Sequence, residues 1–472
     1  MKEILLHARV SHERLPIRLR RKYRVLTVPL SHGRHAAHFN TDVLNLRNLC
    51  GQRWHSGLFD LLNVMCAVRA ADRFFTSAGL FHVRRRIHIA VGVTDVRRWR
   101  NLRPALTNAV AKLSRDVLDF YPIKIPKSPQ LALSSPGNKR HDPLGSSLAP
   151  DSVCLFSGGS DSFCGAAYLL SRRRRPVLVS QSIGPVSGLQ RRLFEALRTR
   201  FPSLPPDTLV QIRTHPNATK IARENPRARL RWASRDKLQR LRSMFFFSLA
   251  GIVAQANDVD EIFMCENGIV GAAIVFAPID DTPYTTRPAE PHFLRAMQHL
   301  LRSALARPKL TIRNPFQYMT KGQVLSFASD MGLRDSLYRT VSCWRSGNCG
   351  IRNCGQCAPC LFRQLAFDEA ALPAAPPAYA YRHPIPRKDW RRWNSHELQR
   401  LIDIKEYCDN AVRIGVSRLM CTELAVVDAI DVTCGSSRDT PDQQGEALDL
   451  VAPRKMAQAI LRFARATLRR LH

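Results

Sequence analysis

Two short segments of this 472-residue chain carry side chains that could do chemistry. The first, Ser157-Gly158-Gly159-Ser160-Asp161-Ser162, sets two glycines, three hydroxyls and a carboxylate between an apolar run and a helical pattern. A glycine-rich turn exposes backbone N–H groups, and a helix N-terminus adds partial positive charge, so together they suit phosphate. Because Asp161 alone would repel phosphate, the segment also predicts a Mg²⁺ ion that bridges this carboxylate to the phosphates.

The second segment is a cysteine cluster, since five of the 13 cysteines fall between Cys343 and Cys360. Cys354, Cys357 and Cys360 follow a C-x-x-C-x-x-C spacing, which puts three thiolates on one tight turn. Four thiolates form a closed tetrahedral zinc site, which is structural and not catalytic. The spacing leaves the fourth ligand open between Cys343 and Cys349, and the alternative to a metal site is a set of reduced thiols.

The residues around these segments alternate between strand and helix patterns, which favours an α/β fold with a parallel sheet covered on both faces. The predicted strands are residues 152–156, 176–182, 208–214, 261–267 and 310–316. The predicted helices are residues 161–173, 188–201, 236–257 and 292–306, and one more that begins at a Thr320–Gln323 capping box. Ligands bind beyond the carboxyl ends of such strands, where the glycine-rich turn follows the first strand and its helix starts at about Ser162.

Two stretches rich in proline and small residues divide the chain, and we predict that both are linkers. They are residues 127–150 and 371–388. They separate an N-terminal mixed α/β region (1–126), a central domain (151–370) and a helical C-terminal region (389–472).

Composition limits the partners and the compartment. The formal net charge is +34, which favours an acidic partner such as nucleic acid or protein, although arginine spread evenly along the chain would give the same excess. The charged first residues predict no signal peptide, and the longest apolar run, Met244 to Gln255, is too short to cross a bilayer. We therefore expect a cytoplasmic protein with no membrane partner.

The segment Ser157-Gly158-Gly159-Ser160-Asp161-Ser162 resembles the signature of the PP-loop ATP pyrophosphatases. This resemblance implies a doubly wound parallel sheet of the adenine nucleotide alpha-hydrolase type and cleavage of ATP between its α and β phosphates. It also implies an ATP site made of Phe156, Ser157, Gly158, Gly159, Ser160, Asp161 and Ser162.

Residues 151–370 further resemble the QueC family, which acts on 7-carboxy-7-deazaguanine. The similar segments are residues 241–255, 283–297, 312–333 and the cysteine segment 340–367. The resemblance favours Cys343 as the fourth zinc ligand, with Cys354, Cys357 and Cys360. It implies catalytic roles for Asp161, Ser162 and Lys321, and substrate contacts from Glu266, Asn267, Asp281 and Arg287. The alternatives are a solvated lysine at 321, an ordinary strand-end turn at 266–268 and a surface loop at 281–287.

The implied reaction activates a poor electrophile. A carboxylate oxygen of the deazaguanine acid attacks the α-phosphate of ATP, which gives an acyl-adenylate and pyrophosphate. An amine then displaces AMP and forms an amide, while the protein stabilises the phosphate charge and holds the reactants in line.

Departures from the QueC pattern shift the expected substrate and partner. Thr285 and Thr286 replace the aspartate and cysteine of the family's Y-P-D-C-R-P-E-F segment, and regions are added at both ends. The long form resembles the QatC proteins of Qat anti-phage defence systems, which implies that deazaguanine is joined to a partner protein. The alternatives are synthesis of free 7-cyano-7-deazaguanine and a non-catalytic adaptor that binds nucleic acid or a partner.

Overall fold

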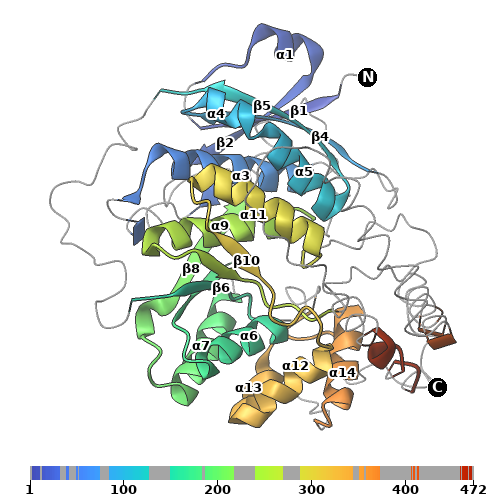
Figure 1. The fold of residues 1–472 in the computed structure, drawn as a ribbon. Coiled ribbons are helices and arrows are strands. Elements are labelled where there is room, and N and C mark those ends of the chain that lie inside the picture. The colour runs from blue at the N-terminus through green and yellow to red at the C-terminus, as the bar shows by residue number, and fades with distance from the viewer. Residues whose placement is uncertain are drawn as a thin grey trace, which may run out of the picture. The chain divides into compact units, whose positions relative to one another are not determined.

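The fold is seen in a computed structural model of the chain (Figure 1). It describes residues 3–10, 13–31, 39–41, 49–50, 53–74, 84–126, 149–182, 186–216, 240–268, 288–343, 350–355, 358–372, 406, 408–409, 412–413, 458, 460–465 and 467–469. The predicted linkers lie mostly outside these residues, so the predicted division into domains stays a prediction.

The described strands form one ten-stranded sheet in the order β10-β9-β6-β7-β8-β3-β2-β1-β4-β5. They are β1 (Ile4–Arg9), β2 (Arg24–Ser31), β3 (Phe39–Thr41), β4 (Arg86–Val93), β5 (Val117–Lys124), β6 (Ser152–Leu155), β7 (Pro176–Ser182), β8 (Leu209–Pro216), β9 (Glu261–Phe263) and β10 (Thr311–Arg313). Central strands such as β4 and β6 are apolar and buried along almost their whole length, as strands covered on both faces must be.

The direction of the strands reverses once. Phe39 to Thr41 of β3 pair antiparallel with β8, and every other printed pairing in the sheet is parallel. The sheet therefore consists of two parallel halves of opposite direction, β10 to β8 and β3 to β5. The predicted α/β class with a parallel sheet is confirmed, and this single antiparallel joint was not predicted.

The helices alternate with the strands along the chain. They are α1 (Ile17–Lys22), α3 (Ser56–Phe74), α4 (Val96–Asn101), α5 (Arg103–Ser114), α6 (Ser160–Ser171), α7 (Val186–Arg200), α9 (Arg242–Asn257), α11 (Pro291–Leu305), α12 (Lys321–Ala328), α13 (Arg334–Arg339) and α14 (Ala358–Glu369), with a short 3-10 turn η2 (Pro206–Thr208) and a π turn η5 (Ser329–Leu333). The described residues beyond position 400 are also helical, as predicted.

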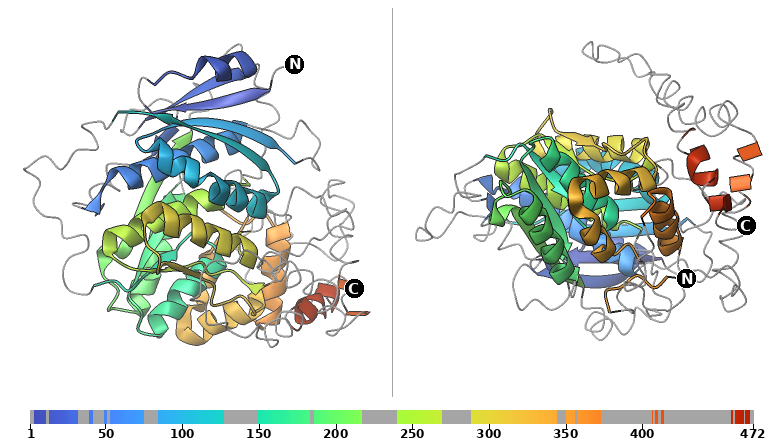
Figure 2. Two further views of the ribbon diagram at one scale, coloured as in Figure 1. Left: turned by 45° about the horizontal axis from the view of Figure 1, so that its top comes forward. Right: turned by 90° about the horizontal axis from the view of Figure 1, so that it is seen from below.

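A layer of helices lies between the two halves of the sheet (Figure 1; Figure 2, left). Helix α3 packs on β1, β2 and β4, helix α9 packs on β6, β7 and β9, and these two helices contact each other. This position explains why α9 is apolar on all sides and buried from Met244 to Ala256. No helix in the described parts of the chain is long and apolar enough to cross a bilayer.

The chain divides into two compact units. The first contains all ten strands and consists of residues 1–158, 165–265 and 281–314. The second consists of residues 159–164, 266–280 and 315–472.

Within the first unit, N-terminal elements are tied to helices that come much later in the sequence. Arg98 Nη2, on α4, donates to the carbonyl oxygens of Ser303 (3.0 Å) and Ala304 (2.8 Å) in the last turn of α11. Arg53 Nη1 donates to Ala256 O (2.8 Å) near the end of α9. Guanidinium groups at these positions satisfy carbonyls that have no partner within the helix, which stabilises both helix C-termini.

Most predicted elements are confirmed with small differences at their ends. Strands 152–156, 176–182 and 208–214 correspond to β6, β7 and β8, whereas the predicted strands at 261–267 and 310–316 are shorter, as β9 and β10. Helix α6 begins at Ser160 and not at about Ser162, so the four residues Phe156–Gly159 lie between β6 and α6.

Candidate functional site

Asp161 is the centre of a buried polar cluster in the second unit. Its side chain is 8% exposed, and it is the second residue of α6. Asn267 Nδ2 donates to Asp161 Oδ1 at 2.9 Å, and Lys321 Nζ forms an ion pair with Asp161 Oδ2. Ser160 Oγ also donates to Oδ2, at 3.4 Å. Both carboxylate oxygens are therefore engaged by donors from three segments that are far apart in the sequence.

Lys321 is held in place by the predicted capping box, which is confirmed. The Thr320 hydroxyl accepts from Gln323 N at 3.2 Å, and Gln323 Oε1 accepts from Thr320 N at 2.9 Å. Lys321 is thus the first residue of α12, and its side chain is 14% exposed. A lysine at this position adds a full positive charge to the partial charge of the helix N-terminus.

The segment Glu266–Gly268 is anchored to the residues that precede α12. Gly268 N donates to Met319 O at 2.7 Å, and a Cβ at Gly268 would lie 2.4 Å from Gln317 O. Only glycine fits this close backbone approach, which brings Asn267 to Asp161. Burial, together with the negative charge of Asp161, raises the pKa of Glu266 from 4.5 to about 8, while the positive charge of Lys321 opposes this shift.

The glycine-rich turn itself has well-defined partners. Phe156 is buried, and its backbone N donates to Val179 O at 2.7 Å. Gln190 Nε2 donates to Ser157 O at 3.2 Å, and Gly158 has a φ of 91°, which a side chain would strain. On the helix side, in the second unit, Ser162 Oγ donates to Gly159 O at 3.0 Å.

Three cysteines meet in the second unit. The Sγ atoms of Cys343, Cys354 and Cys360 are buried and lie within 4.8 Å of one another. The Cys354 and Cys360 sulfurs are 3.9 Å apart, close to the separation of about 3.8 Å that follows from tetrahedral geometry with Zn–S bonds of about 2.3 Å. Cys354 N donates to Cys343 Sγ at 3.3 Å. This buried cluster could hold zinc, since the sulfur separation fits that ion and exceeds a disulfide bond.

A buried hydrogen-bond network fixes the segment before Cys343. Arg363 Nη1 donates to Thr340 Oγ1 at 2.7 Å, and Asn353 Nδ2 donates to Thr340 O at 3.1 Å. Arg363 Nη2 also donates to Leu337 O at 2.7 Å, and its guanidinium lies over the Phe367 ring. Because Arg363 is 2% exposed, every contact of this charge is internal, and its role is to hold the chain in one conformation.

Ser342 connects this network to the Asp161 cluster. Ser342 N donates to Asn353 Oδ1 at 3.1 Å, and the Ser342 hydroxyl lies 3.4 Å from the Ser160 hydroxyl. The sequence interpretation gave no role to Ser342, Asn353 or Arg363. The signal that could have found Ser342 and Arg363 was their position inside the cysteine segment, at the residue before Cys343 and three residues after Cys360.

The structure brings some predicted site residues together and leaves others open. Asp161, Glu266, Asn267 and Lys321 share one cluster, and three of the four predicted zinc ligands share another. The predicted residues Asp281, Arg287 and Cys357, and the alternative ligand Cys349, lie outside the described residues.

The geometry can now be compared with known proteins. Residues 235–371 match the family model of the queuosine biosynthesis protein QueC. The match includes Glu266, Asn267, Lys321 and the cysteine segment, and it begins after the Ser157–Ser162 turn.

Curated relatives agree with this match. The chain is 30% identical over 108 residues to the 7-cyano-7-deazaguanine synthase of Legionella pneumophila (strain Corby), which covers 22% of this chain and 46% of that protein. It is 31% identical over 110 residues to the synthase of Stenotrophomonas maltophilia (strain K279a), covering 22% and 48%, and 29% identical over 112 residues to that of Ectopseudomonas mendocina (strain ymp), covering 23% and 49%. The chain spans about half the length of the curated relatives it matches.

Proposed function

We propose that this chain is an ATP-dependent ligase that adenylates 7-carboxy-7-deazaguanine, or a similar acid, and passes the acyl group to an amine of a partner protein. The observation that carries the proposal is the meeting of Asp161, Asn267 and Lys321 at the N-termini of α6 and α12. Two helix N-termini and a lysine make this a positive site, which is what a polyphosphate needs.

The residues take different roles in this proposal. Lys321 would neutralise charge on the phosphates as pyrophosphate leaves, and Asp161 would hold the lysine and Asn267 in position. Ser162 and the backbone of Ser157–Ser160 would contact phosphate oxygens. Asn267 and the half-buried Glu266 would lie near the acid, where a protonated Glu266 donates a hydrogen bond without adding a second negative charge.

Asp161 does not offer a free oxygen to Mg²⁺ in this arrangement. Asn267, Ser160 and Lys321 engage its two oxygens, and the Lys321 ammonium lies where a cation would bind. We therefore assign the ion no step at Asp161. A Mg²⁺ that arrives with ATP would be held mainly by phosphate oxygens, as is common for this cation.

The cysteine cluster would serve as a structural zinc site. A site closed by four thiolates has no open position for substrate or water. Zinc there would fix Cys343 and hence Ser342, the neighbour of Ser160. Cys357 completes the predicted set of four ligands.

The predicted link to Qat-type defence systems supports a protein as the acceptor of the acyl group.

A second candidate is the synthesis of free 7-cyano-7-deazaguanine from ammonia. The specific observation in its favour is that the curated relatives carry that activity in their names. The two candidates share the first adenylation step. They differ in the amine and in a second ATP-dependent activation, which would convert the primary amide into the nitrile, so one experiment separates them.

The test is pyrophosphate release from ATP with 7-carboxy-7-deazaguanine, run with ammonia and with the proteins encoded beside the gene, followed by intact mass. Lys321→Ala should lower release about 100-fold or more, because a lost charge contact in the transition state has effects of this size. Lys309→Ala is the matched control, since Lys309 is an exposed lysine outside the site. A mass gain on a neighbouring protein would support the ligase, and a small nitrile with ammonia alone would support the second candidate. No release in any mixture would overturn both and favour an adaptor.

A further inference from the structure

Strand β5 forms the outer edge of the sheet, and no described strand pairs with its free side. Val117 N donates to Arg85 O (2.9 Å) and Ile125 N donates to Val93 O (3.0 Å), and the register between β4 and β5 is uninterrupted. Because backbone groups alternate in direction along a strand, the odd-numbered residues face β4 and the even-numbered ones face outward. The outward residues are Leu118, Phe120, Pro122 and Lys124.

Pro122 is one of these outward residues. The backbone nitrogen of Pro122 points away from β4, so the missing N–H of proline removes no hydrogen bond between β4 and β5. A proline is therefore tolerated at this free edge. The N–H groups of Leu118, Phe120 and Lys124 and the carbonyls of all four outward residues remain directed away from the sheet. This is the pattern of donors and acceptors that an added strand requires.

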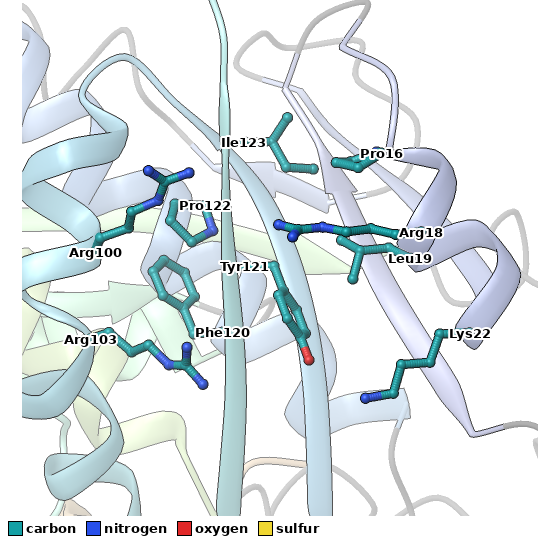
Figure 3. A pocket seen from close by; sticks show the side chains of 10 residues that line it. All are labelled: Pro16, Arg18, Leu19, Lys22, Arg100, Arg103, Phe120, Tyr121, Pro122 and Ile123. Atoms are coloured by element: carbon teal, nitrogen blue, oxygen red, sulfur yellow. The ribbon is translucent and has the colours of Figure 1, made fainter.

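A cavity of about 410 Å³ lies along this edge, and cations line it on both sides of β5 (Figure 3). Arg100 and Arg103, from α4 and the start of α5, lie on one side, and Arg18 and Lys22, from α1, lie on the other. All four side chains belong to exposed residues. The cavity therefore presents positive charge to both faces of anything that lies along the strand.

Within the described parts of the chain, none of the four cations forms an ion pair with a carboxylate. The nearby acid on β5, Asp119, is already paired with Arg86 (2.9 Å) and with His88 (2.9 Å). Four unpaired cations in one cavity favour a negatively charged occupant.

The aromatic residues of the cavity argue against stacked nucleic-acid bases. Phe120 is 1% exposed and packs edge-on against Trp99, with ring centroids 6.0 Å apart. The Tyr121 hydroxyl is 2.9 Å from the Tyr23 hydroxyl, and its ring packs against the buried cluster around Leu19. The Phe120 ring is buried and the Tyr121 ring is half-buried, whereas single-strand binding depends on exposed ring faces.

We propose that the free edge of β5 binds an extended acidic segment of a partner protein as an additional strand. Side chains of a strand alternate between its two faces, so successive carboxylates of the segment would reach Arg100 and Arg103 on one face and Arg18 and Lys22 on the other. The chain's net charge of +34 adds long-range attraction for such a partner. This inference goes beyond the proposed function and does not depend on it, because binding is measured without ATP.

The test begins with a displayed library of random peptides longer than the eight residues of β5, selected on the full chain. Selected peptides should carry Asp or Glu at neighbouring positions, because neighbouring side chains reach opposite faces of the strand. Arg18→Glu/Arg103→Glu should weaken binding of the selected peptide on the order of tenfold, measured by fluorescence anisotropy. The matched control is Arg20→Glu/Arg97→Glu, which reverses two exposed arginines, one on α1 and one on α4, that do not line the cavity. It should change binding by less than about twofold.

Two further arms separate strand addition from simple charge attraction. Methylation of alternate backbone nitrogens of the selected peptide removes its ladder donors while keeping its charge, so binding should be lost. Labelled single-stranded oligonucleotides test the other acidic class. The proposal is overturned if selection gives no acidic pattern, if both variants weaken binding equally, if the methylated peptide binds unchanged, or if an oligonucleotide alone binds through Arg18 and Arg103. Thermal unfolding of both variants checks that they fold.

Discussion

The Ser160 and Ser342 hydroxyl oxygens lie 3.4 Å apart although 182 positions separate the two residues in the sequence. Ser160 begins α6 one residue before Asp161, and Ser342 precedes Cys343. The contact therefore joins the start of α6 to the cysteine cluster. Through this contact, a structural metal bound at Cys343 would help to hold Asp161 and its hydrogen-bond partners in position.

Ser342→Ala tests this contact. Loss of one hydrogen bond should cost about 1 kcal/mol of unfolding free energy, and ATP-dependent pyrophosphate release should fall by more than this small loss explains. Zinc content should stay unchanged, because the thiols are intact. Ser171→Ala is the control, since the Ser171 hydroxyl bonds only within its own exposed turn. Equal effects of the two variants would remove the proposed link.

The ion pair of Asp161 and Lys321 predicts strong coupling between the two residues. Lys321→Met leaves a buried carboxylate without its charge partner and should cost about 3 kcal/mol. Asp161→Asn in the same chain should recover part of this loss, since the unpaired charge is gone. Urea unfolding of the single and double variants measures the coupling. Additive losses would show that the two side chains do not stabilise each other.

Removal of metal should destabilise the second unit. Mass spectrometry under native conditions should find zinc bound to the chain, and chelation should lower the unfolding temperature. Cys354→Ser should abolish zinc binding, whereas Cys50→Ser should retain it, because the Cys50 thiol lies in the first unit and bonds to Ile252 O. Retention of zinc by the Cys354 variant would exclude this thiol as a ligand.

The raised pKa of Glu266 predicts a pH dependence of stability. Its pKa is 4.5 in the unfolded chain and about 8 in the fold, so the folded state binds the proton more tightly. Stability is therefore highest below about pH 4.5 with respect to this group, falls as the pH rises to about 8, and levels off above that value. Glu266→Gln stays neutral, so its stability advantage over the natural chain should grow by roughly 4 kcal/mol between pH 5 and pH 9. A constant difference across that range would contradict the assignment.

Gly268→Ala should disturb the same cluster through the backbone. The new methyl group would meet Gln317 O at 2.4 Å, so the segment must move and take Asn267 away from Asp161. A loss of about 1–3 kcal/mol is expected for such overpacking, together with reduced turnover. Gly188→Ala, with only the end of the Arg192 side chain near the new methyl, should be neutral or slightly stabilising.

Local features of the site could be predicted from the sequence because short-range chemistry determines them. The Thr320–Gln323 capping box fixes the first turn of α12, and the glycines at 158 and 159 place the turn between β6 and α6. The spacing Cys354-x-x-Cys357-x-x-Cys360 likewise predicted a cluster, and Cys343 joins it. Each of these signals lies within a few residues of the structure it specifies.

Long-range features could not be predicted in this way. Nothing local shows that β3, with three residues, joins the N-terminal strands to β8 in one sheet. Arg363 was missed because an arginine is ordinarily expected at the surface. Here the side chain is buried and donates hydrogen bonds to one hydroxyl and two carbonyl oxygens. The Ser160–Ser342 contact depends on the tertiary fold in the same way.

The reversal of strand direction at β3 has a consequence for how the first unit can be used. Parallel strands offer ligands the edge where they end, and the two halves of this sheet end on opposite sides. In the half that contains β6, the carboxyl ends of the strands lie on the side of the glycine-rich turn. In the half that contains β5, the carboxyl ends lie on the opposite side. A ligand at the carboxyl ends of one half would therefore not compete for space with a ligand at the carboxyl ends of the other half.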